Sequence, residues 1–143
     1  MKSLRTLLKI ARRDLETLRR ALADQLARET AVVDRIRGHE QTILAEQEHA
    51  KRDYESGRAY GGYAVAAIAI RRALDAERAL VAQEIDRLRA LIAEAHVEAR
   101  KFERLLELEE ARAKAAREKR ENAELDEFAT ISAARKGNRA IGQ

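Results

Sequence analysis

The chain has 143 residues, enough for one ordinary domain, and 92 of them are Ala, Glu, Leu, Lys or Arg. It contains no Pro, Cys or Trp, six Gly and only 3% aromatic residues. This composition is typical of long helices and coiled coils, and it excludes disulfides and thiolate chemistry. The net charge of +4 is small beside 29 basic and 25 acidic residues, so we expect a surface of mixed charge.

No stretch of the sequence approaches the roughly 18 uncharged apolar residues that a membrane span needs. The N-terminus begins with basic residues but lacks an uninterrupted apolar core behind them, so we expect no secretory signal. With no cysteine in the chain, these features favour a cytoplasmic protein.

Three clustered glycines, Gly57, Gly61 and Gly62, predict where the chain turns, because glycine readily adopts the left-handed conformation that ends helices. We predict a helix over about 3–56, a turn over 57–62, a second helix over about 63–135 and a flexible tail over 136–143. The fold class is all-α: one domain over 1–143, formed by a long two-helix antiparallel coiled-coil hairpin with a longer second helix.

Apolar residues recur with alternating spacings of four and three, which predicts a coiled-coil seam on both helices. In the second helix the seam comprises Val81, Ile85, Leu88, Ile92, Ala95, Ala99, Phe102 and Leu106. In the first helix it comprises Leu4, Leu8, Ala11, Leu15, Leu18 and Leu22. A second spacing of four then leads to Leu26 and predicts a stutter, after which the seam follows Glu29, Val33, Ile36, Glu40, Ile43, Gln47, Ala50 and Tyr54.

A turn centred near residue 59 would pair position i with about 119 − i, so the last 25 or so residues would have no partner within the chain. A helix there would expose Leu125, Phe128, Ala129 and Ile131 near one face. An isolated helix of that length is marginal in water, so we expect it either to fray or to be completed by another molecule.

No motif for catalysis or cofactor binding is present. The sequence has no phosphate-binding loop and no His-Glu-x-x-His motif. A single Glu-x-x-His, at Glu46 and His49, lacks the second copy that a di-iron bundle requires, since Ala93 stands three residues before His96. We therefore predict a non-enzymatic protein with no cofactor and no metal.

Basic residues concentrate at the end of the hairpin opposite the turn. Residues 1–20 carry seven basic side chains against two acidic ones, and Arg135, Lys136 and Arg139 add to them near the C-terminus. This pattern is expected either for a solvated face or for an electrostatic docking end for an acidic partner. Nucleic acid is a less suitable partner, because aromatic residues are not interleaved with the basic ones.

The turn end has an apolar character. Tyr54, Tyr60 and Tyr63 cluster there and precede an apolar run over 64–70. A two-helix seam covers only part of such a run, so we expect some of Tyr63, Ala67, Ile70 and Leu74 to face solvent. An exposed apolar patch indicates a partner site, and the alternatives are a swollen core beside the turn or self-association.

The chain opens with Leu4-x-x-Leu7-Leu8-Lys9-Ile10-Ala11-Arg12. This segment resembles the N-terminus of the FliJ-type family of flagellar export proteins. The C-terminal part is more similar, through Lys101-Phe102-Glu103-Arg104-Leu105-Leu106, the run Glu121-Asn122-Ala123-Glu124-Leu125-Asp126-Glu127-Phe128-Ala129, and Ala134-Arg135-Lys136. Chain length, the two-helix layout and the longer second helix fit the family over nearly the whole chain.

The resemblance implies a non-enzymatic component of the type III protein export apparatus that builds the bacterial flagellum, and hence a role in motility and chemotaxis. FliJ-like proteins form a coiled coil similar to the stalk of the rotary ATPase gamma subunit. They bind the export ATPase, a FliI-like hexamer, and the export gate, an FlhA-like protein, and they bind export chaperones. The implied location is cytoplasmic, peripheral at the cytoplasmic face of the inner membrane through the export apparatus.

The resemblance also implies positions for two partner-binding ends. The ATPase-facing end would comprise Arg5, Lys9, Arg12, Arg13, Leu125, Asp126 and Phe128. The gate-facing end, beside the turn, would comprise Tyr63, Ala67, Ile70 and Leu74. Residues 30–56 and the tyrosine-rich turn have no counterpart in the resemblance.

Two alternatives remain open at this point. One is a generic coiled-coil scaffold or chaperone-like protein, which would dimerise through the overhanging helix. The other is a basic helical protein that binds nucleic acid or an anionic membrane surface.

Overall fold

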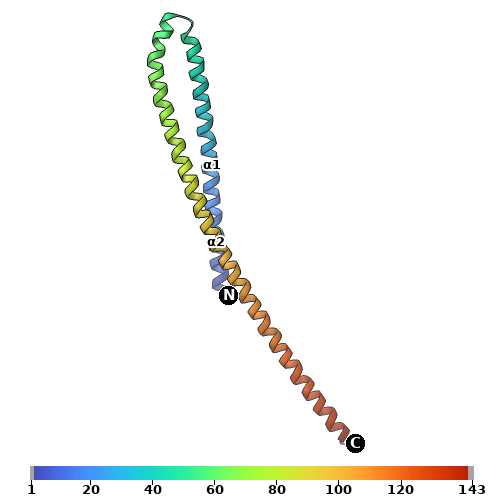
Figure 1. Ribbon diagram of the computed structural model, residues 1–143. Coiled ribbons are helices and arrows are strands. Elements are labelled where there is room, and N and C mark those ends of the chain that lie inside the picture. The colour runs from blue at the N-terminus through green and yellow to red at the C-terminus, as the bar shows by residue number, and fades with distance from the viewer. Residues whose placement is uncertain (1, 142–143) are drawn as a thin grey trace. The chain divides into compact units, whose positions relative to one another are not determined.

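A computed structural model describes residues 2–141 and shows two helices, α1 (Lys2–Ala50) and α2 (Tyr54–Ile141), joined by one short connection (Figure 1). No strand occurs among the described residues. The predicted all-α, two-helix hairpin with a longer second helix is confirmed, since α1 has 49 residues and α2 has 88. The absence of proline permits two helices of this length, because no residue removes a backbone donor from either one.

The turn comprises residues 51–53, so the prediction of a turn over 57–62 is wrong. The amide of Arg52 donates to the carbonyl oxygen of His49 at 3.1 Å, which closes the end of α1. Asp53 then caps α2: its Oδ1 accepts from the backbone amide of Ser56 at 2.7 Å. This hydrogen bond to the ionised carboxylate is the main cause that lowers the pKa of Asp53 below its ordinary value.

The three glycines that suggested the turn are helical. Gly57, Gly61 and Gly62 lie within the first ten residues of α2, and no described glycine has a positive φ. A Cβ on Gly57 would lie 3.3 Å from the carbonyl oxygen of Ala50, whereas Gly61 and Gly62 have open space around them. Glycine here lowers helix propensity without ending the helix, because Asp53 supplies the N-cap four residues earlier.

At the other end, α2 continues through Gly137 to Ile141. The predicted end of the helix near 135 is therefore too early, and the proposed flexible tail over 136–143 is helical as far as residue 141. Residues 142–143 of that tail lie outside the described residues.

The chain divides into two compact units. One unit is Ala11–Val97, where α1 and α2 run antiparallel, with the turn at one end (Figure 1). Its most buried residues include the cluster of Val32, Ile36 and Leu74. The other unit combines the chain up to Ile10 with the chain from Glu98 onward, and there Leu8 and Ala99 are buried.

The predicted seam of the second helix is confirmed, because all eight of its residues are buried or half-buried. The six residues from Leu4 to Leu22 in α1 are also buried or half-buried. The 4-3 spacing that identified these residues therefore describes the packing directly.

The predicted stutter in α1 is wrong. Gln25 is half-buried, whereas Leu26 is exposed, so the 4-3 spacing continues without interruption. The seam residues that follow Leu22 are Gln25, Glu29, Val32, Ile36, His39, Ile43, Glu46 and Ala50. Leu26 was assigned to the seam because it is apolar. The seam instead follows the uninterrupted heptad, which places four polar residues in it.

Polar contacts between the helices fix their alignment in the unit Ala11–Val97. Arg35 contacts Glu77 at 2.9 Å, and the ring nitrogen Nε2 of His39 donates to the carbonyl oxygen of Ala67 at 3.0 Å. Glu77 lies seven residues, one heptad, before the partner that the predicted pairing assigns to Arg35. The earlier turn causes this difference, because it brings earlier residues of α2 beside α1.

Candidate functional site

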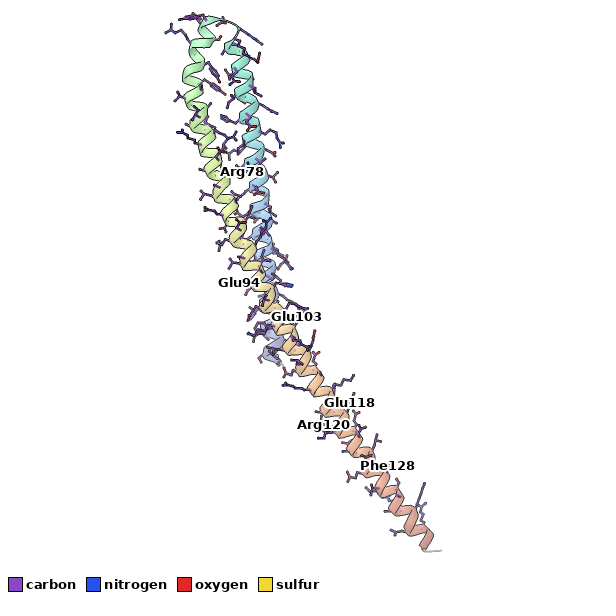
Figure 2. The ribbon with its side chains drawn as sticks, viewed as in Figure 1. Arg78, Glu94, Glu103, Glu118, Arg120 and Phe128 are labelled. Carbon is purple, nitrogen blue, oxygen red and sulfur yellow. The ribbon has the colours of Figure 1, made fainter. Side chains whose placement is uncertain are left out.

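The end of α2 beyond its pairing with α1 is the most exposed helical segment among the described residues. We define the C-terminal arm as residues 114–139. Every residue of the arm is exposed except Ser132, which is half-buried. Leu125 and Phe128 are 65% and 69% exposed, and Ile131 is exposed as well. Figure 2 shows Phe128 standing out from the surface of this helix. The expected unpartnered stretch is therefore present, and it is helical throughout.

The basic residues expected at the ATPase-facing end all lie on α1 with exposed side chains, namely Arg5, Lys9, Arg12 and Arg13. They occupy positions i, i+4, i+7 and i+8, so they share one side of the helix. Arg5 and Lys9 belong to the unit that contains the arm, whereas Arg12 and Arg13 belong to the unit Ala11–Val97.

A shallow basic groove surrounds Arg5. Its Nη2 lies 3.8 Å from Oε1 of Glu110, and both side chains are more than half exposed. The groove has a volume of about 410 Å³ and includes Lys114 and Arg117 of α2. The sequence did not draw attention to Lys114 and Arg117, although the predicted pairing of position i with about 119 − i places residue 114 opposite Arg5.

The arm residues expected at the same end lie apart from this groove. Leu125 follows Glu110 by 15 residues, which corresponds to roughly 22 Å along a helix. Asp126 is exposed, and its carbonyl oxygen accepts from Oγ1 of Thr130 at 2.9 Å within the arm. Arg5 and Phe128 therefore belong to two surfaces of this unit and not to one patch.

The residues expected at the gate-facing end are only partly accessible. Ile70 is 51% exposed and Tyr63 is half-buried, but Ala67 and Leu74 are buried. Of the four residues, Ala67 and Leu74 therefore do not contribute to a solvent-facing patch. They precede Val81 by 14 and 7 residues and continue its seam position, and Leu74 lies with Val32 and Ile36 in the core.

Other apolar side chains near the turn are exposed instead, namely Leu44, Tyr54, Val65 and Ile68. A groove of about 440 Å³ lies beside Ile68. It is lined by Ile43, Tyr60, Ala64, Ala67, Ile68, Arg71 and Arg72. We call this surface the turn groove. Tyr60 contributes an aromatic ring to this groove, and the centroid of the Tyr63 ring lies 5.9 Å from that of Tyr60.

One wall of the turn groove is held in place by Arg71. Its Nη1 donates to Oε1 of Glu40 at 2.6 Å, and its Nε donates to Oδ1 of Asp75 at 3.1 Å. These hydrogen bonds, first to Glu40 and then to Asp75, raise the pKa of Arg71 above its ordinary value. Arg71 therefore links α1 to α2 and is already engaged by two carboxylates.

Over the described residues, no group of three or more His, Cys, Asp or Glu side chains is arranged to hold a metal ion. His49 contacts Oγ of Ser56 through Nε2 at 3.4 Å across the turn. Together with Glu46, His49 borders a groove of about 390 Å³ beside Tyr60 and Tyr63. This is a contact between the end of α1 and the start of α2.

Neither α1 nor α2, as far as each is described, has a stretch long and apolar enough to cross a membrane. Comparison of the sequence with protein-family models and with curated proteins, and of the fold with solved structures, finds no match. The surfaces that stand out on physical grounds are thus the C-terminal arm, the basic groove around Arg5 and the turn groove.

Proposed function

We propose that this protein is a non-enzymatic component of the flagellar type III export apparatus, which binds the export ATPase ring and couples it to the export gate. The observation that carries the proposal is the C-terminal arm, an exposed helix that presents Leu125 and Phe128 without a partner. An isolated helix with exposed apolar side chains is stabilised when another protein covers those side chains. The arm is therefore suited to insertion into a binding site on a partner.

The basic groove around Arg5 supports an electrostatic contribution to the same contact. Arg5, Lys9, Lys114 and Arg117 lie in the unit that carries the arm, and they suit an acidic surface on the ATPase. The segments Lys101–Leu106 and Glu121–Ala129, on which the resemblance to FliJ-type proteins rests most strongly, also belong to this unit. In this proposal the arm supplies apolar contact and the groove supplies charge.

The turn end is proposed to contact the gate. Ile70 and Tyr63 keep accessible surface there, and the turn groove adds Tyr60 and Ile68. Leu74 supports this surface from the seam, and Ala67, although mostly buried, also lines the turn groove. Binding of export chaperones and attachment to the inner membrane through these partners belong to the same proposal.

The test is co-purification with the hexameric ATPase encoded beside this gene or elsewhere in the same genome. We expect the triple variant Arg5→Glu, Lys9→Glu, Arg12→Glu to lose most of the ATPase binding at physiological salt, because it changes the charge by six units on one side of α1. A second variant, Leu125→Ser with Phe128→Ser, should weaken binding at all salt concentrations.

A matched control reverses three exposed arginines near the turn, in the variant Arg52→Glu, Arg58→Glu, Arg72→Glu. This control should retain ATPase binding although its net charge changes equally. Full binding by the triple variant at the basic end would contradict the proposal, and so would equal loss in the control. In either case the generic scaffold becomes the better explanation. Binding to duplex DNA or to acidic vesicles at physiological salt would instead favour the basic helical binder.

A further inference from the structure

Charge along the C-terminal arm is arranged in blocks. Residues 121–127 contain Glu121, Glu124, Asp126 and Glu127 and no basic residue. Residues 128–134 are uncharged, and residues 135–139 contain Arg135, Lys136 and Arg139 and no acidic residue. An acidic block, an apolar block and a basic block therefore follow one another within 19 residues of a single helix.

The charged side chains of these blocks are not paired with one another. None of the ion pairs in the described part of the chain involves a residue of 121–139, and those of α2 lie at Glu110 or before it. The two blocks lie too far apart along the helix for contact at i, i+3 or i, i+4, the spacings at which helical neighbours meet. Their charges are thus available to another molecule.

Four residues of the arm lie on one face. Glu124, Phe128, Ile131 and Arg135 are separated by four, three and four residues, which is the spacing of a coiled-coil seam. Leu125 flanks this face. We call it the arm seam. It has two exposed apolar residues in the middle, an acid at one end and a base at the other.

Such a face is complementary to a second copy of itself in the antiparallel orientation. With a two-fold axis between residues 129 and 130, Phe128 of each copy meets Ile131 of the other, and Glu124 meets Arg135 twice. A parallel, in-register pair would instead place acid beside acid and base beside base. A symmetric dimer uses the same patch on both subunits, and the arm seam satisfies that condition.

We propose that the C-terminal arm binds a second copy of this chain through an antiparallel, two-fold symmetric helix pair centred between Ala129 and Thr130. The inference does not depend on the proposed function, because charge order and exposure of the arm carry it. It adds a consequence: an arm held by a second copy has its Phe128 covered, so self-pairing and any other use of this face exclude each other. The short apolar block makes the dimer reversible.

The test is sedimentation equilibrium of the full chain over a wide concentration range, without other proteins. We expect a reversible monomer–dimer equilibrium. Glu124→Arg should weaken the dimer roughly tenfold or more, because both symmetric contacts become repulsive, and Arg135→Glu should do the same. The double variant Glu124→Arg, Arg135→Glu should restore dimerisation, since it exchanges the two charges and keeps the pairing.

Asp126→Arg is the matched control, because it makes the same charge change within the acidic block but on the opposite side of the helix. It should alter the dissociation constant less than twofold. Circular dichroism at equal concentration checks that each variant remains helical. The proposal is overturned if the chain is monomeric at every concentration, if the double variant fails to recover, or if Asp126→Arg weakens the dimer as much as Glu124→Arg.

Discussion

Arg35 of α1 donates from a single nitrogen, Nη1, to both carboxylate oxygens of Glu77 of α2, at 3.1 Å and 2.9 Å. The pair joins the helices beside the core cluster of Val32, Ile36 and Leu74. The pair lies at the surface, and both side chains are about half exposed. It therefore contributes more to the alignment of the two helices than to the free energy of unfolding.

A double-mutant cycle on this pair should give a small coupling energy. We expect Arg35→Ala, Glu77→Ala and the double variant to yield less than about 1 kcal/mol of interaction in urea denaturation, falling as salt is added. A coupling energy above about 2 kcal/mol that is insensitive to salt would contradict this assignment of the pair to the solvated surface.

The glycines of α2 offer a direct test of where the turn lies. Gly61→Ala and Gly62→Ala should each stabilise the protein by about 0.5–1 kcal/mol, because both positions are helical, have negative φ and have open space for a Cβ. Gly57→Ala should gain less, since its Cβ would meet the carbonyl oxygen of Ala50. If Gly61 and Gly62 formed a turn, the same substitutions would lower the melting temperature instead.

The helix cap at Asp53 should give the stability a measurable pH dependence. Its pKa is lowered in the folded state, chiefly by the hydrogen bond from Ser56, so its contribution is present above the unfolded pKa and is lost as the pH falls through the folded one. Below about pH 4 the wild-type protein should therefore lose stability relative to Asp53→Asn, whose amide oxygen caps without titrating. Melting temperatures measured between pH 7 and pH 2.5 provide the comparison, and parallel pH profiles would rule the cap out as their cause.

The continuous heptad of α1 predicts opposite outcomes at two neighbouring positions. Gln25→Leu should stabilise the protein by roughly 1 kcal/mol, because residue 25 lies in the seam and an apolar side chain there would be removed from water. Leu26→Gln should cost about 1 kcal/mol, because Leu26 keeps 37% of its surface exposed and lies at the edge of the seam instead of in it. Thermal unfolding of the two single variants checks the pair. If Leu26→Gln lowered the free energy of unfolding by more than about 2 kcal/mol, Leu26 would lie in the seam and the predicted stutter would be correct.

The features that the sequence predicted well are those that follow from periodicity. The seam from Val81 to Leu106 could be identified because every member is apolar and the spacing never changes. Exposure of Leu125 and Phe128 followed from the unequal lengths of the helices, which result from a turn at 51–53 as well as from one at 57–62.

The position of the turn and the seam residue at 25 or 26 were predicted wrongly, and in each case the correct answer depended on a single residue. The predicted turn rested on three glycines alone, although a helical glycine costs only about 1 kcal/mol, and the cap that Asp53 provides was not considered. Ala67 and Leu74 were assigned to the turn-end patch although they lie 14 and 7 residues before Val81, at the same position of the heptad. At residues 25 and 26, side-chain polarity predicted that Leu26 lies in the seam. In the structure Gln25 occupies that position and packs toward α2.

The polar seam positions of α1 have a consequence for the uniqueness of the fold. A heptad repeat looks the same after sliding by seven residues, so two purely apolar helices would have several alignments of nearly equal energy. Sliding α1 by one heptad here would separate His39 from the carbonyl of Ala67 and Arg35 from Glu77, while Gln25, Glu29 and Glu46 would all exchange their neighbours. The residues that weaken the seam thus remove the degeneracy that its regularity would otherwise create.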